Sequence, residues 1–291
     1  MVKHSHAIKY YATAAGAVFT ALAIILSLRL ILKHRSIING PSPLRNPKEQ
    51  WKIIYILAMT PLFAISSFVG LIEWDANETF IMCLDSVKEC YEAWVILSFL
   101  TLMYSLAGIS LSKKTIPPNL AKKHIHQIAP LSWFLSDWPV NTSTLSNLRM
   151  WCVQFILLRP ILSIISVYLE SVERYEEFSM YFSVALNISV TLAVYALMMF
   201  YHTFEEELAS QRPLAKFLCI KGVVFFAFWQ GVIVQGLVYY GIIHQGKWYS
   251  VEELSTFIQN FLVCFEMGLI FTFANAYAFS IEPYLQKPKS N

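Results

Sequence analysis

The stretch that decides the fold is MWCVQFILLRPILSIISVYL, residues 150–169, an apolar run with Arg159 and Pro160 side by side near its middle. A helix of about 20 residues, rising about 1.5 Å per residue, is long enough to cross the hydrocarbon core of a bilayer. Inserting a guanidinium at the centre of such a span costs about 2.5–3.5 kcal/mol or more, so Arg159 should face the protein interior or a hydrated cavity and have a partner. Pro160 removes a backbone donor and is a predicted kink. The stretch therefore predicts either a structural helix with a buried ion pair or a path for a polar solute.

Composition extends this reading to the whole chain. Of the 291 residues, 56% are hydrophobic and only 14% are charged, which is far from the balance of a soluble domain. The apolar runs predict an all-α, polytopic membrane protein with seven transmembrane helices, at about residues 10–32, 53–72, 90–111, 150–169, 178–200, 217–241 and 256–280. Pro61, in the second span, is a further predicted kink.

Charge predicts the orientation of these spans. Basic residues gather in the loops at 33–52 and 112–149, whereas acidic residues gather at 73–89 and 170–177. Because basic loops stay in the cytosol, the N-terminus should lie outside or in the lumen, and the short tail 281–291 in the cytosol. Trp133 and Trp138 predict a short interfacial helix in the cytosolic loop 112–149. Asn77 begins a glycosylation sequon, Asn-Glu-Thr, in a loop predicted to be lumenal.

Several polar residues inside the spans are candidates for a buried polar site. Glu266, near the middle of the seventh span, has the opposite charge to Arg159, and pairing would offset part of the desolvation cost of each. Helices 4 and 7 are therefore predicted to meet near mid-depth, with Arg159 and Glu266 paired directly or through water. Four further polar residues are candidates for a solute path, and three of them have a structural alternative. Asn187, in a stripe with Ser183 and Thr191, could bridge helices, Lys221 could extend to the headgroups, and Glu92 could be an exposed interfacial charge. The fourth, Gln230, lies in the middle of the sixth span.

No catalytic chemistry is indicated. The chain has no zinc-ligand helix, P-loop, nucleophile elbow or glycine-rich dinucleotide loop, so we expect no enzyme activity, no catalytic residue, no cofactor and no metal. His124 and His126 are expected to be solvated loop histidines. The five cysteines have no zinc spacing, and only Cys83 and Cys90 lie outside the apolar runs, where a lumenal disulfide is an open alternative.

A set of short motifs spread over the predicted spans carries a family resemblance. They are Asp85-Ser86-Val87-Lys88-Glu89-Cys90-Tyr91-Glu92-Ala93, Arg159-Pro160, Asn187-Ile188-Ser189-Val190, Tyr195-Ala196-Leu197, Lys216-Phe217, Lys221, Phe228-Trp229-Gln230-Gly231 and Cys264-Phe265-Glu266-Met267. Together they resemble the organic solute transporter subunit alpha and transmembrane protein 184 family over nearly the whole chain. Ser66 and the region of Ser105 depart from it, since the family usually has acidic residues there.

The resemblance implies a facilitative transporter of amphipathic organic solutes, steroid-like or anionic, that uses neither nucleotide nor metal. Its expected partners are the solute, the bilayer and a single-span subunit or a homodimer mate, with no nucleic acid. The first alternative is a non-transporting vacuolar or endosomal scaffold in trafficking, autophagy or organelle integrity, which binds cytosolic trafficking proteins through its basic loops. A seven-helix receptor is the third. The expected location is an endomembrane, of the vacuole, lysosome or endosome, with the plasma membrane as the alternative.

Overall fold

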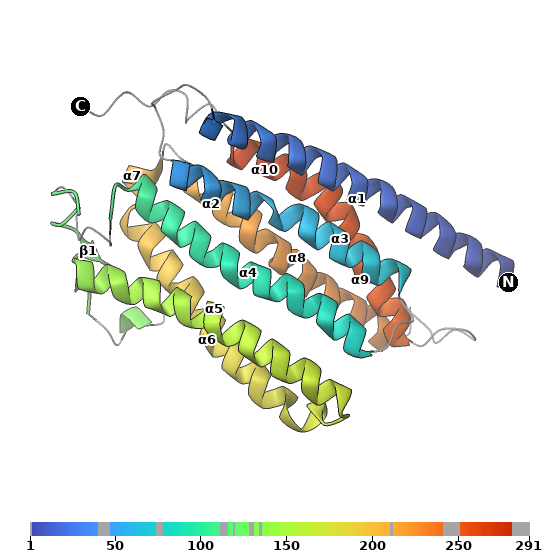
Figure 1. Ribbon diagram of the computed structural model, residues 1–291. Coiled ribbons are helices and arrows are strands. Elements are labelled where there is room, and N and C mark those ends of the chain that lie inside the picture. The colour runs from blue at the N-terminus through green and yellow to red at the C-terminus, as the bar shows by residue number, and fades with distance from the viewer. Residues whose placement is uncertain are drawn as a thin grey trace. The chain divides into compact units, whose positions relative to one another are not determined.

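The computed structural model describes residues 2–39, 47–73, 78–110, 116–118, 120–127, 131–133, 136–209, 212–240 and 251–280, and these are predominantly helical (Figure 1). The chain divides into two compact units. Unit 1 comprises Met1–Gly40, Leu57–Lys88 and Ala215–Ile281, and unit 2 comprises Pro41–Ile56, Glu89–Leu214 and Glu282–Asn291.

Unit 1 is built around the first and last long helices of the chain. Its elements are α1 (Val2–Asn39), α3 (Met59–Ile72), the beginning of α4 (Glu78–Leu106), most of α8 (Pro213–Tyr239), α9 (Val251–Glu266), the π-helical segment η3 (Met267–Phe271) and α10 (Thr272–Ala278). α1 packs on α3, α9, η3 and α10, and Figure 1 shows α1 running alongside α9 and α10. Helices from the beginning and the end of the chain thus share one core.

Glycine allows the closest approach in this unit. A Cβ on Gly268 would lie 2.6 Å from the carbonyl oxygen of Phe19 and 3.0 Å from its Cα, so η3 touches the backbone of α1. On the same level, the ring of Phe19 makes an edge contact with that of Phe265 at 5.2 Å between centroids. Further along, the buried His34 at the end of α1 hydrogen bonds to the carbonyl of Phe279 at 2.9 Å. α1 and the α9–η3–α10 segment therefore run parallel.

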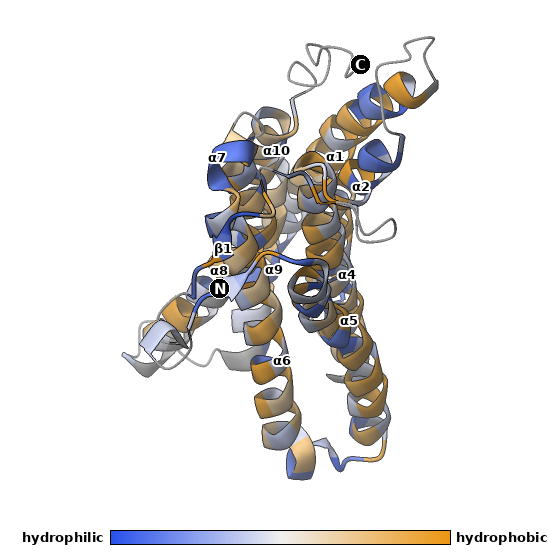
Figure 2. Ribbon diagram, turned by 90° about the vertical axis from the view of Figure 1, so that its left-hand side faces the viewer, coloured by the Kyte–Doolittle hydropathy of each residue, from blue (hydrophilic) through white to orange (hydrophobic). Residues whose placement is uncertain are grey.

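Unit 2 is a row of antiparallel helices with a small hairpin at one end. It contains α2 (Pro47–Leu57) up to residue 56, the rest of α4, the strands β1 (His124–Ile125) and β2 (Trp138–Pro139), the 3-10 turn η1 (Leu131–Trp133), and the helices α5 (Thr142–Ser171), α6 (Tyr175–Thr203) and α7 (Glu205–Leu208). α5 begins at Asn141, whose side chain accepts a hydrogen bond from the backbone N–H of Thr144 at 2.7 Å, as is typical of an N-cap. α5 and α6 pack along each other, and Figure 2 shows both hydrophobic over most of their length and hydrophilic at their connection.

Five helical stretches are long and apolar enough to cross a membrane, namely Lys9–Ile38, Pro47–Ile72, Thr142–Ser171, Tyr175–Thr203 and Glu253–Ala278. The second is interrupted at Ala58, three residues before Pro61, whereas α5 continues through Pro160. The predicted number of seven spans and the predicted orientation stay predictions.

Three local predictions meet the described residues in different ways. In the loop 112–149, the part around the predicted interfacial helix that the structure describes is the single turn Leu131–Trp133. All five cysteines are free, and Cys83 and Cys90 lie in one helix, seven residues or about 10 Å of rise apart, which excludes a disulfide between them. Asn77 and the tail 281–291 lie outside the described residues.

Candidate functional site

An ion pair within unit 2 joins Arg159 of α5 to Glu89 of α4. The two helices run antiparallel, because the hydroxyl of Tyr104 donates to the carbonyl of Leu145 at 2.8 Å at the far end of the same interface. Arg159 is largely covered, with 14% of its side chain exposed, whereas 45% of the Glu89 side chain is exposed. The arginine is thus held by a carboxylate that remains reachable.

The sequence did not single out Glu89, because this residue was assigned to a loop outside the membrane. In the structure α4 begins at Glu78, so Glu89 lies 11 residues, or about 16 Å, inside a helix. The same early start corrects the position of Glu92. Of its two alternatives, the exposed interfacial position is not observed: Glu92 is only 8% exposed and lies 14 residues inside α4, as a buried polar residue.

A second polar contact joins α5 to α6 near the middle of both helices. Gln154 donates from Nε2 to the carbonyl of Ser189 at 2.9 Å, and the hydroxyl of Ser189 donates back to Oε1 of Gln154 at 2.6 Å. Arg159 follows Gln154 by five residues, about 7.5 Å along α5. Unit 2 therefore places an amide–hydroxyl pair and an ion pair on neighbouring levels inside a helical stretch long enough to span a membrane.

Asn187, the predicted helix-bridging or cavity-lining residue, is exposed and bonds along its own helix. Its Nδ2 donates to the carbonyl of Ser183 at 2.8 Å, and the hydroxyl of Thr191 donates to the carbonyl of Asn187 at 2.6 Å. The stripe therefore satisfies part of its own hydrogen bonding while presenting an amide on the surface of α6.

In unit 1 the predicted residues Gln230 and Glu266 are brought together. Nε2 of Gln230, on α8, donates to Oε1 of Glu266, the last residue of α9, and Glu266 is only 4% exposed. Lys221 lies on the same helix as Gln230, nine residues or about 13 Å earlier. Arg159 and Glu266 belong to different units, so their predicted pairing stays a prediction, and the acid recorded beside Arg159 is Glu89.

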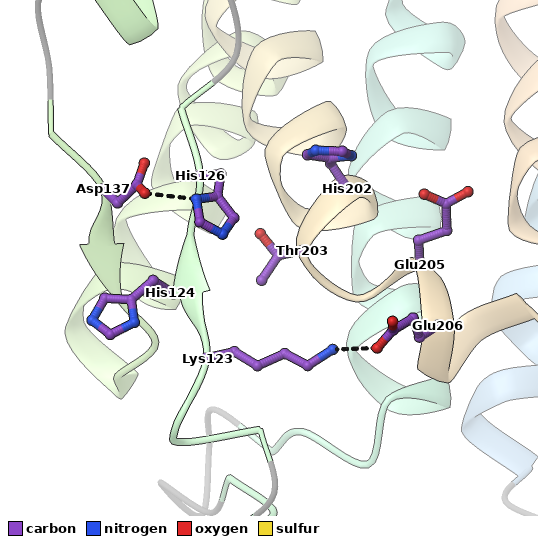
Figure 3. A pocket seen from close by; sticks show the side chains of 8 residues that line it. All are labelled: Lys123, His124, His126, Asp137, His202, Thr203, Glu205 and Glu206. Carbon is purple, nitrogen blue, oxygen red and sulfur yellow. Dashed lines mark hydrogen bonds and ion pairs between the residues drawn. The ribbon is translucent and has the colours of Figure 1, made fainter.

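A third site lies where the β1–β2 hairpin meets the end of α6. It is a pocket of about 560 Å³, lined from the hairpin side and from the α6–α7 side as Figure 3 shows. Within it, Nδ1 of His126 and Oδ2 of Asp137 lie 2.6 Å apart, and Lys123 is 3.2 Å from Glu206 and, at the edge of the pocket, 2.8 Å from Glu207. The lining residues are Lys123, His124, His126, Asp137, His202, Thr203, Glu205 and Glu206.

The charges around this pocket stabilise one another. The hydrogen bond with His126 lowers the pKa of Asp137, and hydrogen bonds with Glu207 and Glu206 raise the pKa of Lys123. Burial, the largest single effect, would raise the pKa of Glu207, but the hydrogen bond with Lys123, a backbone hydrogen bond and the charge of Lys123 together leave the pKa lowered. The two Lys123 pairs tie the hairpin to α7, which follows α6, and the sequence could not indicate them because the partners are up to 84 residues apart.

The histidines of this pocket are not arranged as a metal site. Within the described ranges, no group of three or more His, Cys, Asp or Glu side chains could hold a metal ion. His124 and His126 are exposed, in line with the expectation of solvated loop histidines. The sequence did not predict Asp137 as a partner of His126. The antiparallel pairing of His124 with Pro139 places Asp137 opposite His126.

Comparison with known proteins gives the family. The family described as organic solute transporter Ostalpha matches residues 12–284. A transmembrane protein 184 homolog from Dictyostelium discoideum is 32% identical over 278 residues, which are 93% of this chain and 52% of that protein. A protein named LAZ1 homolog 1 from Arabidopsis thaliana is 30% identical over 293 residues, 93% of this chain and 57% of that protein.

The chain thus spans about half the length of the curated relatives it matches. No solved structure matches it. The five apolar helical stretches and the family match together identify a multi-pass membrane protein. A match that covers nearly the whole chain means that this protein belongs to the organic solute transporter Ostalpha family.

Proposed function

We propose that this protein is a facilitative transporter of amphipathic organic anions, such as steroid conjugates, and that Arg159 is the residue that binds the anionic group. The observation that carries the proposal is the asymmetric exposure of the Arg159–Glu89 pair, in which the arginine is covered and the carboxylate is accessible. An anion that leaves water for a membrane interior loses its hydration, and a fixed guanidinium replaces part of it. A solute carboxylate or sulfate would take the place of Glu89 on Arg159.

The polar groups on the neighbouring levels fit this path. The Gln154–Ser189 pair, about 7.5 Å away along α5, fixes α5 to α6 on the neighbouring level by two hydrogen bonds. The apolar surfaces of α5 and α6 suit the hydrophobic body of an amphipathic molecule. We therefore place the solute path in unit 2, along α4, α5 and α6.

The proposal includes the membrane arrangement predicted from sequence. Seven spans, an N-terminus outside or in the lumen and a cytosolic C-terminus put the basic loops in the cytosol. The proposed location is an endomembrane of the vacuole, lysosome or endosome. The protein acts without catalytic chemistry, and a single-span subunit or a second copy of the chain is its proposed membrane partner.

Flux measurement in liposomes tests this proposal. Purified protein is reconstituted, and uptake of a labelled steroid sulfate is compared between the wild type, Arg159→Gln and Arg159→Lys. Because a hydrogen bond to a charged group contributes about 1.5–3 kcal/mol, we expect Arg159→Gln to lower the flux about tenfold or more. Arg159→Lys keeps the charge and should retain more flux. A neutral steroid of the same size should move at similar rates in all three proteins.

Two outcomes would count against the proposal, the first against the role of Arg159 and the second against transport itself. One is wild-type flux of the sulfate through Arg159→Gln, which would remove the arginine from the path. The other is no flux at all through wild-type protein that remains monodisperse and shows a cooperative thermal transition. The second result, together with retained binding of a cytosolic trafficking protein, would favour the scaffold.

The scaffold is kept as a second candidate because one observation favours it. The hairpin outside the spans is fixed to the α6–α7 end by Lys123 and by Tyr195, whose hydroxyl donates to Oε1 of Gln127 at 2.9 Å. A connecting loop does not require a fixed surface with a pocket, whereas a binding site for a partner protein does. Lys123→Met should loosen the hairpin, and we expect it to reduce recruitment of a partner protein if the scaffold is correct and to leave solute flux unchanged if transport is correct.

A further inference from the structure

The Glu266–Gln230 contact in unit 1 contains two buried acceptors without a donor. Oε1 of Glu266 receives the amide of Gln230, but Oε2 of Glu266 and Oε1 of Gln230 have no hydrogen-bond partner among the described residues. Each unsatisfied buried polar atom costs about 1–3 kcal/mol, and more if it is charged. If Glu266 is ionised, the contact therefore lacks a hydrogen donor between these two oxygens.

Glu266 forms no ion pair within the part of the chain that the structure describes. At its level α1 presents the ring of Phe19, and α3 presents Ala64, whose carbonyl accepts from the thiol of Cys264 at 3.8 Å. α3 has no ionisable residue at all.

The ionisable groups on the neighbouring elements are distant along their helices or already engaged. On α8 the nearest cation is Lys221, about 13 Å from Gln230 along the axis. On α4 the nearest is Lys88, which is 2.6 Å from Asp85. Among the side chains that the structure describes on α1, α8, α9 and α10, the others are Lys9, Tyr10, Tyr11, Arg29, Lys33, His34 and Arg35 on α1, Lys216 and Cys219 on α8, Glu253 and Cys264 on α9, and Tyr277 on α10.

We propose that Glu266 is a proton-binding site, and that its carboxyl group is held neutral by forming a two-hydrogen-bond ring with the amide of Gln230. A proton taken from water binds to Oε2 of Glu266 and is donated to Oε1 of Gln230, while Nε2 of Gln230 donates to Oε1 of Glu266. One proton thus satisfies both unpartnered oxygens. It also removes the negative charge, whose burial in a span is costly.

Other occupants satisfy less of this site. A bridging water donates to both oxygens but leaves an unpaired carboxylate in the interior. A sodium or potassium ion would neutralise the charge. Hard metal cations need several oxygen ligands, however, and this contact offers only the oxygens of one carboxyl group and one amide. The proton is the occupant that requires neither extra space nor extra ligands.

The position of the site gives protonation a structural consequence. Glu266 is directly followed by the π-helical segment η3, where Gly268 touches the backbone of Phe19. Loss of the proton would leave Oε2 of an ionised Glu266 beside Oε1 of Gln230, two acceptors with no donor between them, at the residue directly before this segment. We therefore expect deprotonation to loosen α8 from α9, and this consequence does not depend on which solute, if any, the protein moves.

Infrared spectroscopy of the reconstituted protein at neutral pH tests the protonation state directly. A neutral carboxylic acid gives a carbonyl stretch separate from that of a carboxylate, and the band shifts in heavy water. We expect such a band in the wild type and its loss in Glu266→Gln. Two variants should keep the band, namely Glu89→Gln, which removes an ionised acid, and Lys88→Met, which removes the nearest cation on α4.

A second measurement protects the test against misfolding. Glu266→Gln resembles the neutral acid in shape and can still pair with Gln230, so its thermal transition at neutral pH should match that of the wild type. Raising the pH should destabilise the wild type but not the variant. The proposal is overturned if the wild type lacks the acid band, if Glu266→Gln keeps it, or if stability follows sodium or potassium concentration instead of pH.

Discussion

Neutralising the two members of the Arg159–Glu89 pair, singly and together, should reveal a coupling free energy of about 1–3 kcal/mol. Breaking a fully buried pair costs about 3–5 kcal/mol, whereas a fully exposed pair contributes about 0–1 kcal/mol. With 14% of Arg159 and 45% of Glu89 exposed, this pair lies between these limits. The variants Arg159→Met and Glu89→Gln remove each charge while keeping most of the volume.

The free energy of unfolding of the four proteins would be measured in the same detergent, and the coupling taken from the double-mutant cycle. A parallel cycle with Glu266→Gln in place of Glu89→Gln tests the pairing that the sequence predicted. Because Glu266 is engaged with Gln230, we expect its cycle to be additive within about 0.5 kcal/mol. Additivity in the Glu89 cycle, or strong coupling in the Glu266 cycle, would refute the assignment of Glu89 as the partner of Arg159.

Two further predictions concern packing and the hairpin. Gly268→Ala should lower the free energy of unfolding by about 1–3 kcal/mol, because the new Cβ would overlap the backbone of Phe19. Gly236→Ala is the control, because no atom lies within 4 Å of its new Cβ. Equal thermal transitions in the two variants would contradict the close approach of η3 to α1. The hairpin should loosen in acid. The pKa of Asp137 is lowered from its ordinary value of 3.8, so the ionised carboxylate stabilises the fold at pH values above 3.8, and this contribution is lost as the pH falls through the lowered pKa. Hydrogen exchange at the Gln127 amide, which donates to Asp137 at 3.3 Å, should therefore rise below about pH 4 in the wild type relative to Asp137→Asn at the same pH, and identical exchange in the two proteins would contradict it.

Hydropathy was sufficient to predict the helices but not where they begin. The run at 150–169 lies inside α5, and its proline does not interrupt the helix. For α4 the charged residues between 78 and 89 concealed the start, because hydropathy measures the cost of leaving water and not the tendency to form a helix. A helix can extend through a charged segment when, as with Lys88 and Asp85, neighbouring turns pair their charges.

The sequence could identify the polar residues but not their partners. Arg159, Gln230 and Glu266 stand out in apolar runs, and all three form polar contacts. Opposite charge and similar depth predict Glu266 as a partner of Arg159, and that pairing stays a prediction. Glu89, the acid that contacts Arg159, was not identified, because which helices are neighbours depends on packing that cannot be read from a single sequence. The hairpin pocket was missed for the same reason, since each of its residues is ordinary in its own loop.

The two polar contacts also differ in a way that bears on what each can do. The Arg159–Glu89 pair keeps both charges and leaves the carboxylate accessible, so another anion can compete for the arginine. The Glu266–Gln230 pair is covered and lacks one donor, so the smallest available cation, the proton, completes it. If both assignments are correct, Glu89→Gln should strengthen the inhibition of flux by small anions and leave the pH dependence of flux unchanged. Glu266→Gln should change the pH dependence of flux and leave the inhibition by small anions unchanged. Because each variant is the control for the other, a single set of flux measurements over pH and anion concentration separates a site that exchanges anions from one that holds a proton.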